Sequence, residues 1–201
     1  MLSEILSQLN WVDFFIIIIM IRVVYVSAKT GFVIEFFKLV GIVFALYLSL
    51  HYYIITADIL KQRVVNVENY IPLEFFDLLV FVFVLFISCA AFAVIRGVMC
   101  HFIKMEAVPM LSRWGAVVLG VARGILISSA IIFILLISTI KYLDNSARES
   151  YSGKRLFNVA VGTYSFIWDN FMSKLMPGES YNEQVSQIEA DFNPKAEITG
   201  F

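Results

Sequence analysis

The sequence predicts an all-α membrane protein with four transmembrane helices, a C-terminal amphipathic helix and a disordered acidic tail. Apolar residues make up 60% of the 201 residues, and the mean hydropathy of +0.84 lies far above that of ordinary soluble domains. Several apolar segments are each long enough for a helix to cross a hydrocarbon core about 30 Å thick. After residue 141 the chain turns polar, which leaves one compact membrane domain and a tail.

The predicted membrane domain covers residues 1–141, with spans at about residues 11–28, 32–55, 78–95 and 114–140. The first span begins at Trp11, which suits a membrane interface. No basic residue precedes it, so we interpret it as a retained helix and not as a cleaved signal peptide. The third span lies between Asp77 and Arg96 without an internal charge, and Arg123 is the one ionisable residue of the fourth.

Residues 142–176 are predicted to form a polar linker followed by an amphipathic helix. Between Leu156 and Leu175, apolar and aromatic residues recur at helical spacing, which is typical of a helix that lies on the bilayer or packs on the bundle. Pro177 and Gly178 end this pattern. Residues 177–201 are acidic and hold few large apolar side chains, so we expect them to be disordered.

Small residues occur at every fourth position in the first half of the fourth span. This spacing places them on one helix face, where a second helix can approach closely. With the glycines of the other segments, they form the predicted helix-packing set of Gly31, Gly41, Gly115, Ala116, Gly120, Gly124 and Ser128. We expect these faces to mediate tight packing and self-association.

The predicted intramembrane charges are Arg22, Glu35, Lys38 and Arg123. A bare charge in a membrane helix costs about 2.5–3.5 kcal/mol on insertion scales, so Arg123 requires a partner or a wet cavity. Glu35 and Lys38 are three residues apart and can pair on one helix. A pair across helices between Glu35 and either Arg123 or Arg22 is the alternative, and Arg22 is also near enough to its helix end to snorkel.

The composition and motifs argue against several other functions. A net charge of −1 does not fit a nucleic-acid-binding protein. Cys89 and Cys100 form no ligand cluster with the histidines, so we expect no metal site and no cofactor. Ser88, His51 and His101 show no nucleophile–base arrangement, so no catalytic residue is assigned. His51 lies in an aromatic segment, where we expect it to contact lipid headgroups.

Several motifs of the spans resemble those of the colicin V production protein (CvpA) family, from about residue 10 to about residue 155. The motifs are Trp11-Val12-Asp13, Gly31-Phe32-x-x-Glu35 with Gly41, and Arg113-Trp114-Gly115 with Gly120-x-x-Arg123-Gly124. The last resembles the family's most recognisable motif, at the head of its fourth helix. Two features depart from the pattern. Ser112 stands where an acidic residue is common, and Lys29-Thr30-Gly31 replaces a more usual Arg-Gly pair.

The resemblance implies a bacterial inner-membrane protein that is required for the production or export of a colicin V-type peptide toxin and has a wider role in envelope maintenance. We expect a non-enzymatic accessory protein whose partners are the lipid bilayer and either further copies or other envelope and export proteins. The alternative is a small oligomeric channel or transporter whose path the intramembrane charges line. Basic residues follow the first helix but do not precede it, which favours periplasmic termini.

Overall fold

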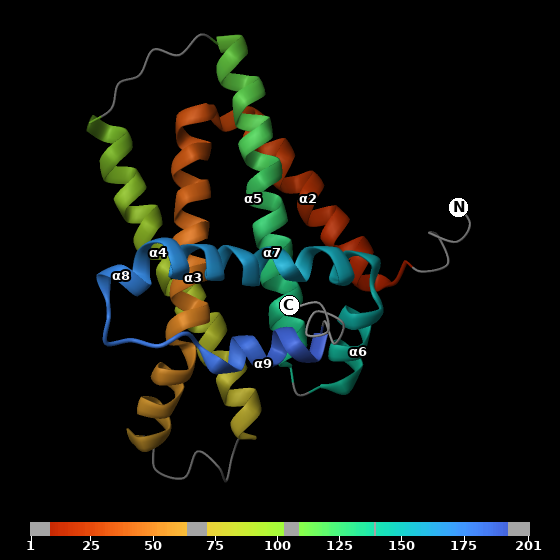
Figure 1. Cartoon of the computed structure of the whole chain (residues 1–201). Coiled ribbons are helices and arrows are strands. Elements are labelled where there is room, and N and C mark those ends of the chain that lie inside the picture. Colours follow the sequence, from red (N-terminus) through yellow and green to blue (C-terminus); the bar gives the residue numbers. More distant parts are fainter. Residues whose placement is uncertain (1–8, 64–71, 103–108, 139, 193–201) are drawn as a thin grey trace, which may run out of the picture.

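Four long helices dominate the computed structural model of the chain (Figure 1). The structure describes residues 9–63, 72–102, 109–138 and 140–192. The long helices are α2 (Trp11–Thr30), α3 (Phe32–Arg63), α4 (Leu73–Phe102) and α5 (Pro109–Ile137), and each contains a segment long and apolar enough to cross a membrane. Every regular element in these described ranges is helical, so the predicted all-α membrane fold is confirmed.

Two of the long helices extend well beyond the predicted spans. α3 continues past residue 55 to Arg63, and α4 starts before residue 78 and ends after residue 95. Hydropathy marks the part of a helix that lipid can surround, whereas backbone hydrogen bonding propagates through polar residues once a helix has formed. Pro72 directly precedes α4, and its carbonyl accepts the Phe76 amide at 3.1 Å, which opens the helix.

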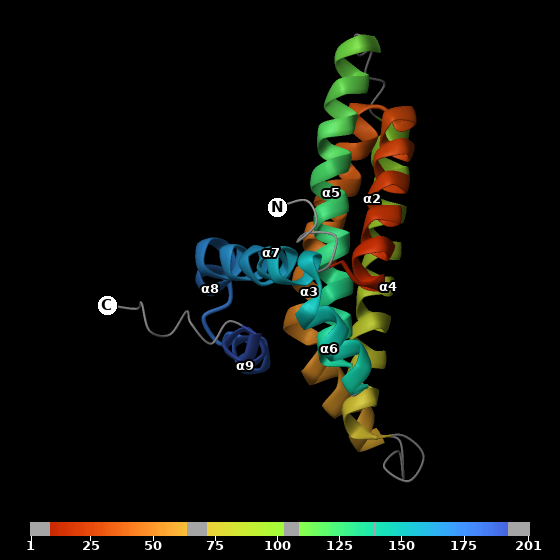
Figure 2. The same cartoon turned by 90° about the vertical axis from the view of Figure 1, so that its right-hand side faces the viewer.

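The four long helices form a row in which neighbours in space are not always neighbours in the chain. α5 packs between α2 and α3, and α4 packs on the other side of α3, which gives the order α2–α5–α3–α4 (Figure 1). α2 and α3, although consecutive, contact each other little. Figure 2 shows this row as a narrow slab with the later helices projecting from one face.

A layer of shorter helices covers part of that face. It comprises α6 (Lys141–Glu149), α7 (Tyr151–Ile167), the π-helical turn η2 (Trp168–Met172), α8 (Ser173–Leu175) and α9 (Glu183–Phe192). α7 crosses the row and, with η2 and α8, accounts for the predicted amphipathic helix. The preceding segment, which we interpreted as a polar linker, is itself mostly helical because α6 occupies it.

Ser150 separates α6 from α7. Its backbone is extended, with φ −63° and ψ 145°, and its Oγ accepts the Gly153 amide at 2.8 Å. A serine in this position satisfies an amide that the first turn of a helix would otherwise leave without an acceptor. The Ala147 carbonyl lies so close to Gly153 that a side chain there would collide with it. The chain can therefore turn sharply from α6 into α7.

Two polar residues of the row hold α7 in place. Asp13 of α2 is 1% exposed, and its carboxylate accepts the Ser152 amide at 2.7 Å and the Tyr151 amide at 3.3 Å. A carboxylate suits the positive end of a helix, so α2 fixes the start of α7. Farther along, Ser129 of α5 donates to the Leu156 carbonyl and accepts the Ala160 amide at 2.7 Å.

The apolar core lies where α7 crosses the row. Phe157, Val161 and Tyr164 of α7 are at most 1% exposed, and they pack toward α3 and α5. The rings of Phe133 and Phe157 stack with centroids 6.3 Å apart. α7 is therefore part of the folded core and does more than rest on a lipid surface.

The expectation of disorder over residues 177–201 requires a correction. The structure describes residues 177–192, and α9 occupies Glu183–Phe192; residues 193–201 lie outside the described part. Val185 of α9 is fully buried, and the Phe192 ring lies 4.4 Å from the Phe157 ring, centroid to centroid. Val185, Ile188 and Phe192 recur at helical spacing, a pattern that the acidic average composition concealed.

Candidate functional site

The candidate site is a cluster of charged and polar side chains around Glu35, which is completely buried. Glu35 Oε1 accepts hydrogen bonds from Lys38 Nζ and Thr30 Oγ1, both at 2.5 Å. Glu35 Oε2 accepts a hydrogen bond from Ser27 Oγ at 3.0 Å and lies 3.2 Å from Arg123 Nη2. The cluster thus joins α2, α3 and α5 through one carboxylate.

The local sequence explains how these groups meet. Gly31 has φ +86°, a left-handed conformation that side chains rarely tolerate, and it reverses the chain between α2 and α3. The reversal brings Ser27 and Thr30, in the last turns of α2, beside Glu35 in the first turn of α3. Lys38 follows one turn later on the same helix face. Only Arg123 has to come from a distant part of the chain.

The burial of this cluster makes each of its charges dependent on a partner. The side chains of Lys38 and Arg123 are 15% and 12% exposed, and Glu35 is not exposed at all. In such surroundings a charge without a partner is far more costly than at a surface, so each group depends on the others. The arrangement places two cations against one carboxylate and leaves a net positive charge.

The predicted packing glycines lie against other helices of the same chain. A side chain at Gly120 would collide with Ser27, one at Gly124 would approach Met20 Sδ within 2.6 Å, and one at Gly115 would meet the Phe32 ring. Gly31 faces Ser112 and Gly41 faces Phe92, while Ala116 and Ser128 are completely buried. The glycine face of α5 is therefore occupied by α2 and is not open to another copy.

The structure separates the four predicted intramembrane charges. Glu35, Lys38 and Arg123 meet, whereas Arg22 is exposed on α2 and lies outside the cluster. Arg96 of α4, in contrast, lines a cavity together with Lys38 and Arg123. We had interpreted Arg96 only as the charge that ends the third span. Arg96 lies on the side of α4 that faces α3 and α5, and the sequence does not reveal which side that is.

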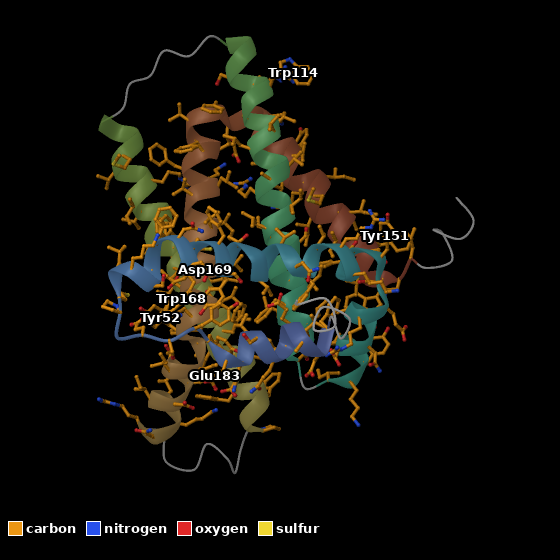
Figure 3. All side chains as sticks on the ribbon, in the orientation of Figure 1. Tyr52, Trp114, Tyr151, Trp168, Asp169 and Glu183 are labelled. Carbon is orange, nitrogen blue, oxygen red and sulfur yellow. The ribbon has the colours of Figure 1, made fainter. Side chains whose placement is uncertain are left out.

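A second polar cluster, which the sequence analysis missed, surrounds His51. His51 is 4% exposed, so the expectation that it contacts lipid headgroups is wrong. Its Nδ1 lies 2.9 Å from the Tyr164 hydroxyl, and its Nε2 lies 2.7 Å from Glu179 Oε2. Its ring stacks on Tyr47 and Trp168, with Tyr52 at its edge. Figure 3 labels Tyr52 and Trp168 of this cluster, which lie near each other.

The hydrogen bonds fix part of the proton arrangement in this second cluster. The Glu179 carboxylate can only accept, so His51 Nε2 donates to it. The Tyr164 oxygen accepts the Asn182 amide at 3.1 Å, and the direction of its bond with His51 Nδ1 follows the protonation of the imidazole. Burial raises the pKa of Tyr164, so this hydroxyl stays protonated over the neutral range. The cluster ties the segment that contains Glu179 and Asn182 to α3 and α7.

Comparison with known proteins provides one match. The model of the colicin V production protein family matches residues 12–160, which run from the second residue of α2 through α3, α4, α5 and α6 into α7. No curated protein and no solved structure matches the chain.

Proposed function

The chain belongs to the colicin V production protein family, and from this premise we propose that it is a non-enzymatic accessory protein of the bacterial inner membrane. The family and the four spanning helices make it a multi-pass membrane protein involved in colicin V production. In our proposal the protein is required for producing or exporting a colicin V-type peptide toxin, and it also contributes to envelope maintenance.

The observation that carries the accessory role is the Glu35 cluster. Its ionic contacts join α2, α3 and α5, and the charges serve one another within the chain. Such a cluster supports a rigid membrane frame, because Glu35, Lys38 and Arg123 are ion-paired within the chain. The helical layer on one face of this frame then forms the part that other proteins can reach (Figure 2).

The packing of the glycines limits which helix faces are free to contact partners. Because α2 occupies the glycine face of α5, contacts inside the bilayer with further copies or with export proteins fall to the outer helices of the row. α2 and α4 both expose large apolar side chains there, including Ile18, Ile21, Phe83 and Phe86. In a bilayer these faces meet either lipid or another membrane helix.

The test is secretion of the toxin by a host in which this protein is replaced by variants. Arg123→Leu removes the cation that pairs with Glu35 from another helix and should reduce toxin release strongly at equal protein levels. Arg22→Leu removes an exposed cation of the same apolar region and should leave release near the wild-type level. Equal toxin release from the wild type and both variants would contradict the role of the cluster.

A channel or transporter is the second candidate, and the cavity lined by Lys38, Arg96 and Arg123 favours it. The measurement is ion and small-solute flux through proteoliposomes that contain the wild type or Arg123→Ala. The accessory role predicts no flux from folded protein. Flux that changes with the substitution would replace the accessory role by a conducting one.

The proposed orientation places both termini in the periplasm, because Arg22 and Lys29 follow the start of the first helix and no basic residue precedes it. The orientation is tested with a single cysteine at position 174, where Lys174 is exposed, in a chain whose Cys89 and Cys100 are replaced by serine. In the proposed orientation this cysteine lies in the periplasm. Labelling of intact cells by a membrane-impermeant maleimide is expected. Labelling only after the inner membrane is opened would reverse the orientation.

A further inference from the structure

A cavity of about 200 Å³ lies between α3, α4 and α5. Each helix contributes one cation to its lining: Lys38 from α3, Arg96 from α4 and Arg123 from α5. The remaining lining is mostly apolar and includes Phe37 and Phe92. Three cations around one small apolar space are unusual inside a membrane domain, where positive charges are costly.

The carboxylate beside this cavity does not balance its charge. Glu35 bonds with Lys38 and Arg123, which leaves the four groups with an excess of positive charge. Among the described residues, Arg96 has no ion pair, and the buried Nε of Arg123 has no hydrogen-bond acceptor. Arg96 therefore stands in the cavity lining as an unpaired cation, which an anion would satisfy.

The position of the cavity relative to the membrane interface suits an amphipathic ligand. Lys38 lies six residues beyond Phe32, about 9 Å along α3 from the reversal at Gly31. The reversal marks one end of α2, whose length matches the hydrocarbon core. The cations thus lie within reach of one membrane interface, and the apolar walls continue below them.

We propose that this cavity binds a phosphate-type anion, supplied either by the headgroup of an anionic phospholipid or by a free phosphate. Arg96 is the residue that recognises it, with Lys38 and Arg123 as the further cations of the lining. Guanidinium groups suit this role because they offer paired donors that match phosphate oxygens. The inference goes beyond the role in toxin production and does not depend on it.

The test uses the full-length chain purified in a neutral detergent. In the lipid arm, phosphatidylglycerol and phosphatidylcholine are offered in equal amounts, and native mass spectrometry measures the ratio of bound lipids. In the phosphate arm, inorganic phosphate is added, and the shift in melting temperature is measured. Binding in the lipid arm alone assigns the site to a headgroup, and stabilisation in the phosphate arm assigns it to a free anion; each supports the site.

Arg96→Gln is the main variant because it leaves the Glu35 contacts in place. Loss of one charge-assisted contact should lower the preference for the anion on the order of tenfold. Arg22→Gln is the matched control, since Arg22 is an exposed cation of α2 that does not line the cavity. Circular dichroism of both variants checks that the helices are retained.

Ala93→Phe separates binding inside the cavity from attraction by surface charge. Ala93 is an exposed residue of the cavity lining, and a phenyl ring there takes up space beside the cations while every cation remains. We expect this variant to lose binding as Arg96→Gln does. The proposal is overturned if Ala93→Phe binds like the wild type, if Arg96→Gln and Arg22→Gln behave alike, or if neither arm detects an anion.

Discussion

The two polar clusters on α3 differ in chemistry and in the distance along the chain that they bridge. The Glu35 cluster is built on an ion-paired carboxylate, and Ser27, Thr30 and Lys38 lie within eight residues of Glu35. The His51 cluster relies on stacked rings and on hydrogen bonds of the imidazole, and His51 is separated from Tyr164 by 113 positions and from Glu179 by 128. α3 thus carries a local ionic cluster near one end and a long-range aromatic cluster farther along.

The difference indicates two separate structural roles. Ionic contacts in a buried place fix α5 to the α2–α3 reversal, and losing one partner leaves a charge with no solvent to receive it. The contacts of His51 attach residues 178–192 to the row, and losing them exposes polar groups that water at the interface can satisfy. Damage to the first cluster should therefore unfold the membrane domain, whereas damage to the second should release the C-terminal segment.

The largest expected effect is that of Glu35→Leu. This change leaves Lys38 and Arg123 together without a counter-charge and should lower the free energy of unfolding by about 3–5 kcal/mol. Unfolding in mixed micelles, with increasing sodium dodecyl sulfate, measures the change. Arg22→Leu serves as the control and should change the stability by less than about 1 kcal/mol, because it alters a surface cation.

A double-mutant cycle sharpens the same comparison. Glu35→Leu combined with Arg123→Leu should cost clearly less than the sum of the two single changes, because the second substitution removes a charge that the first left unpaired. Additive losses would show that Glu35 and Arg123 act independently, in conflict with their 3.2 Å contact.

An intermediate effect is expected from His51→Phe. The phenyl ring keeps the stacking on Tyr47 and Trp168 but loses the hydrogen bonds to Tyr164 and Glu179, at a cost of about 1–3 kcal/mol. Amide hydrogen exchange should rise in α9 while α5 stays protected. Tyr52→Phe, which removes a more exposed bond to Glu179, should give a smaller rise. Equal loss of protection in α5 and α9 would contradict separate roles for the two clusters.

The smallest effect concerns alkaline pH. Burial raises the pKa of Tyr164 above its ordinary value of 10.0, which means that folding favours the protonated phenol. The contribution of Tyr164 to the free energy of unfolding is complete below pH 10. It is lost as the pH rises toward the higher pKa of the folded state, and the loss is at most about 1.4 kcal/mol per pH unit. Exchange rates in α9 between pH 9 and 11, corrected for intrinsic exchange, should rise less steeply in Tyr164→Phe. Identical slopes in both proteins would contradict this coupling.

Residues outside the membrane segments show where sequence reasoning reached its limit. The helical spacing from Leu156 predicted α7, because amphipathic periodicity is a local property of the chain. The same periodicity in Val185, Ile188 and Phe192 was overlooked, since acidic neighbours dominate the composition of that stretch. Its docking partner Phe157 lies far away in the chain and cannot be inferred from the stretch itself.

The sequence by itself determined the four membrane helices, since hydropathy sums over consecutive residues and needs no knowledge of neighbours in space. It also identified Glu35, Lys38 and Arg123 as charges that require partners. Only the tertiary structure decided that Glu35 meets Arg123 and not Arg22. The order α2–α5–α3–α4 differs from the order in the chain, and it selects which helix faces meet. Packing between those faces, a non-local property, decides which charges pair, which helix fills the glycine face and where Arg96 lies.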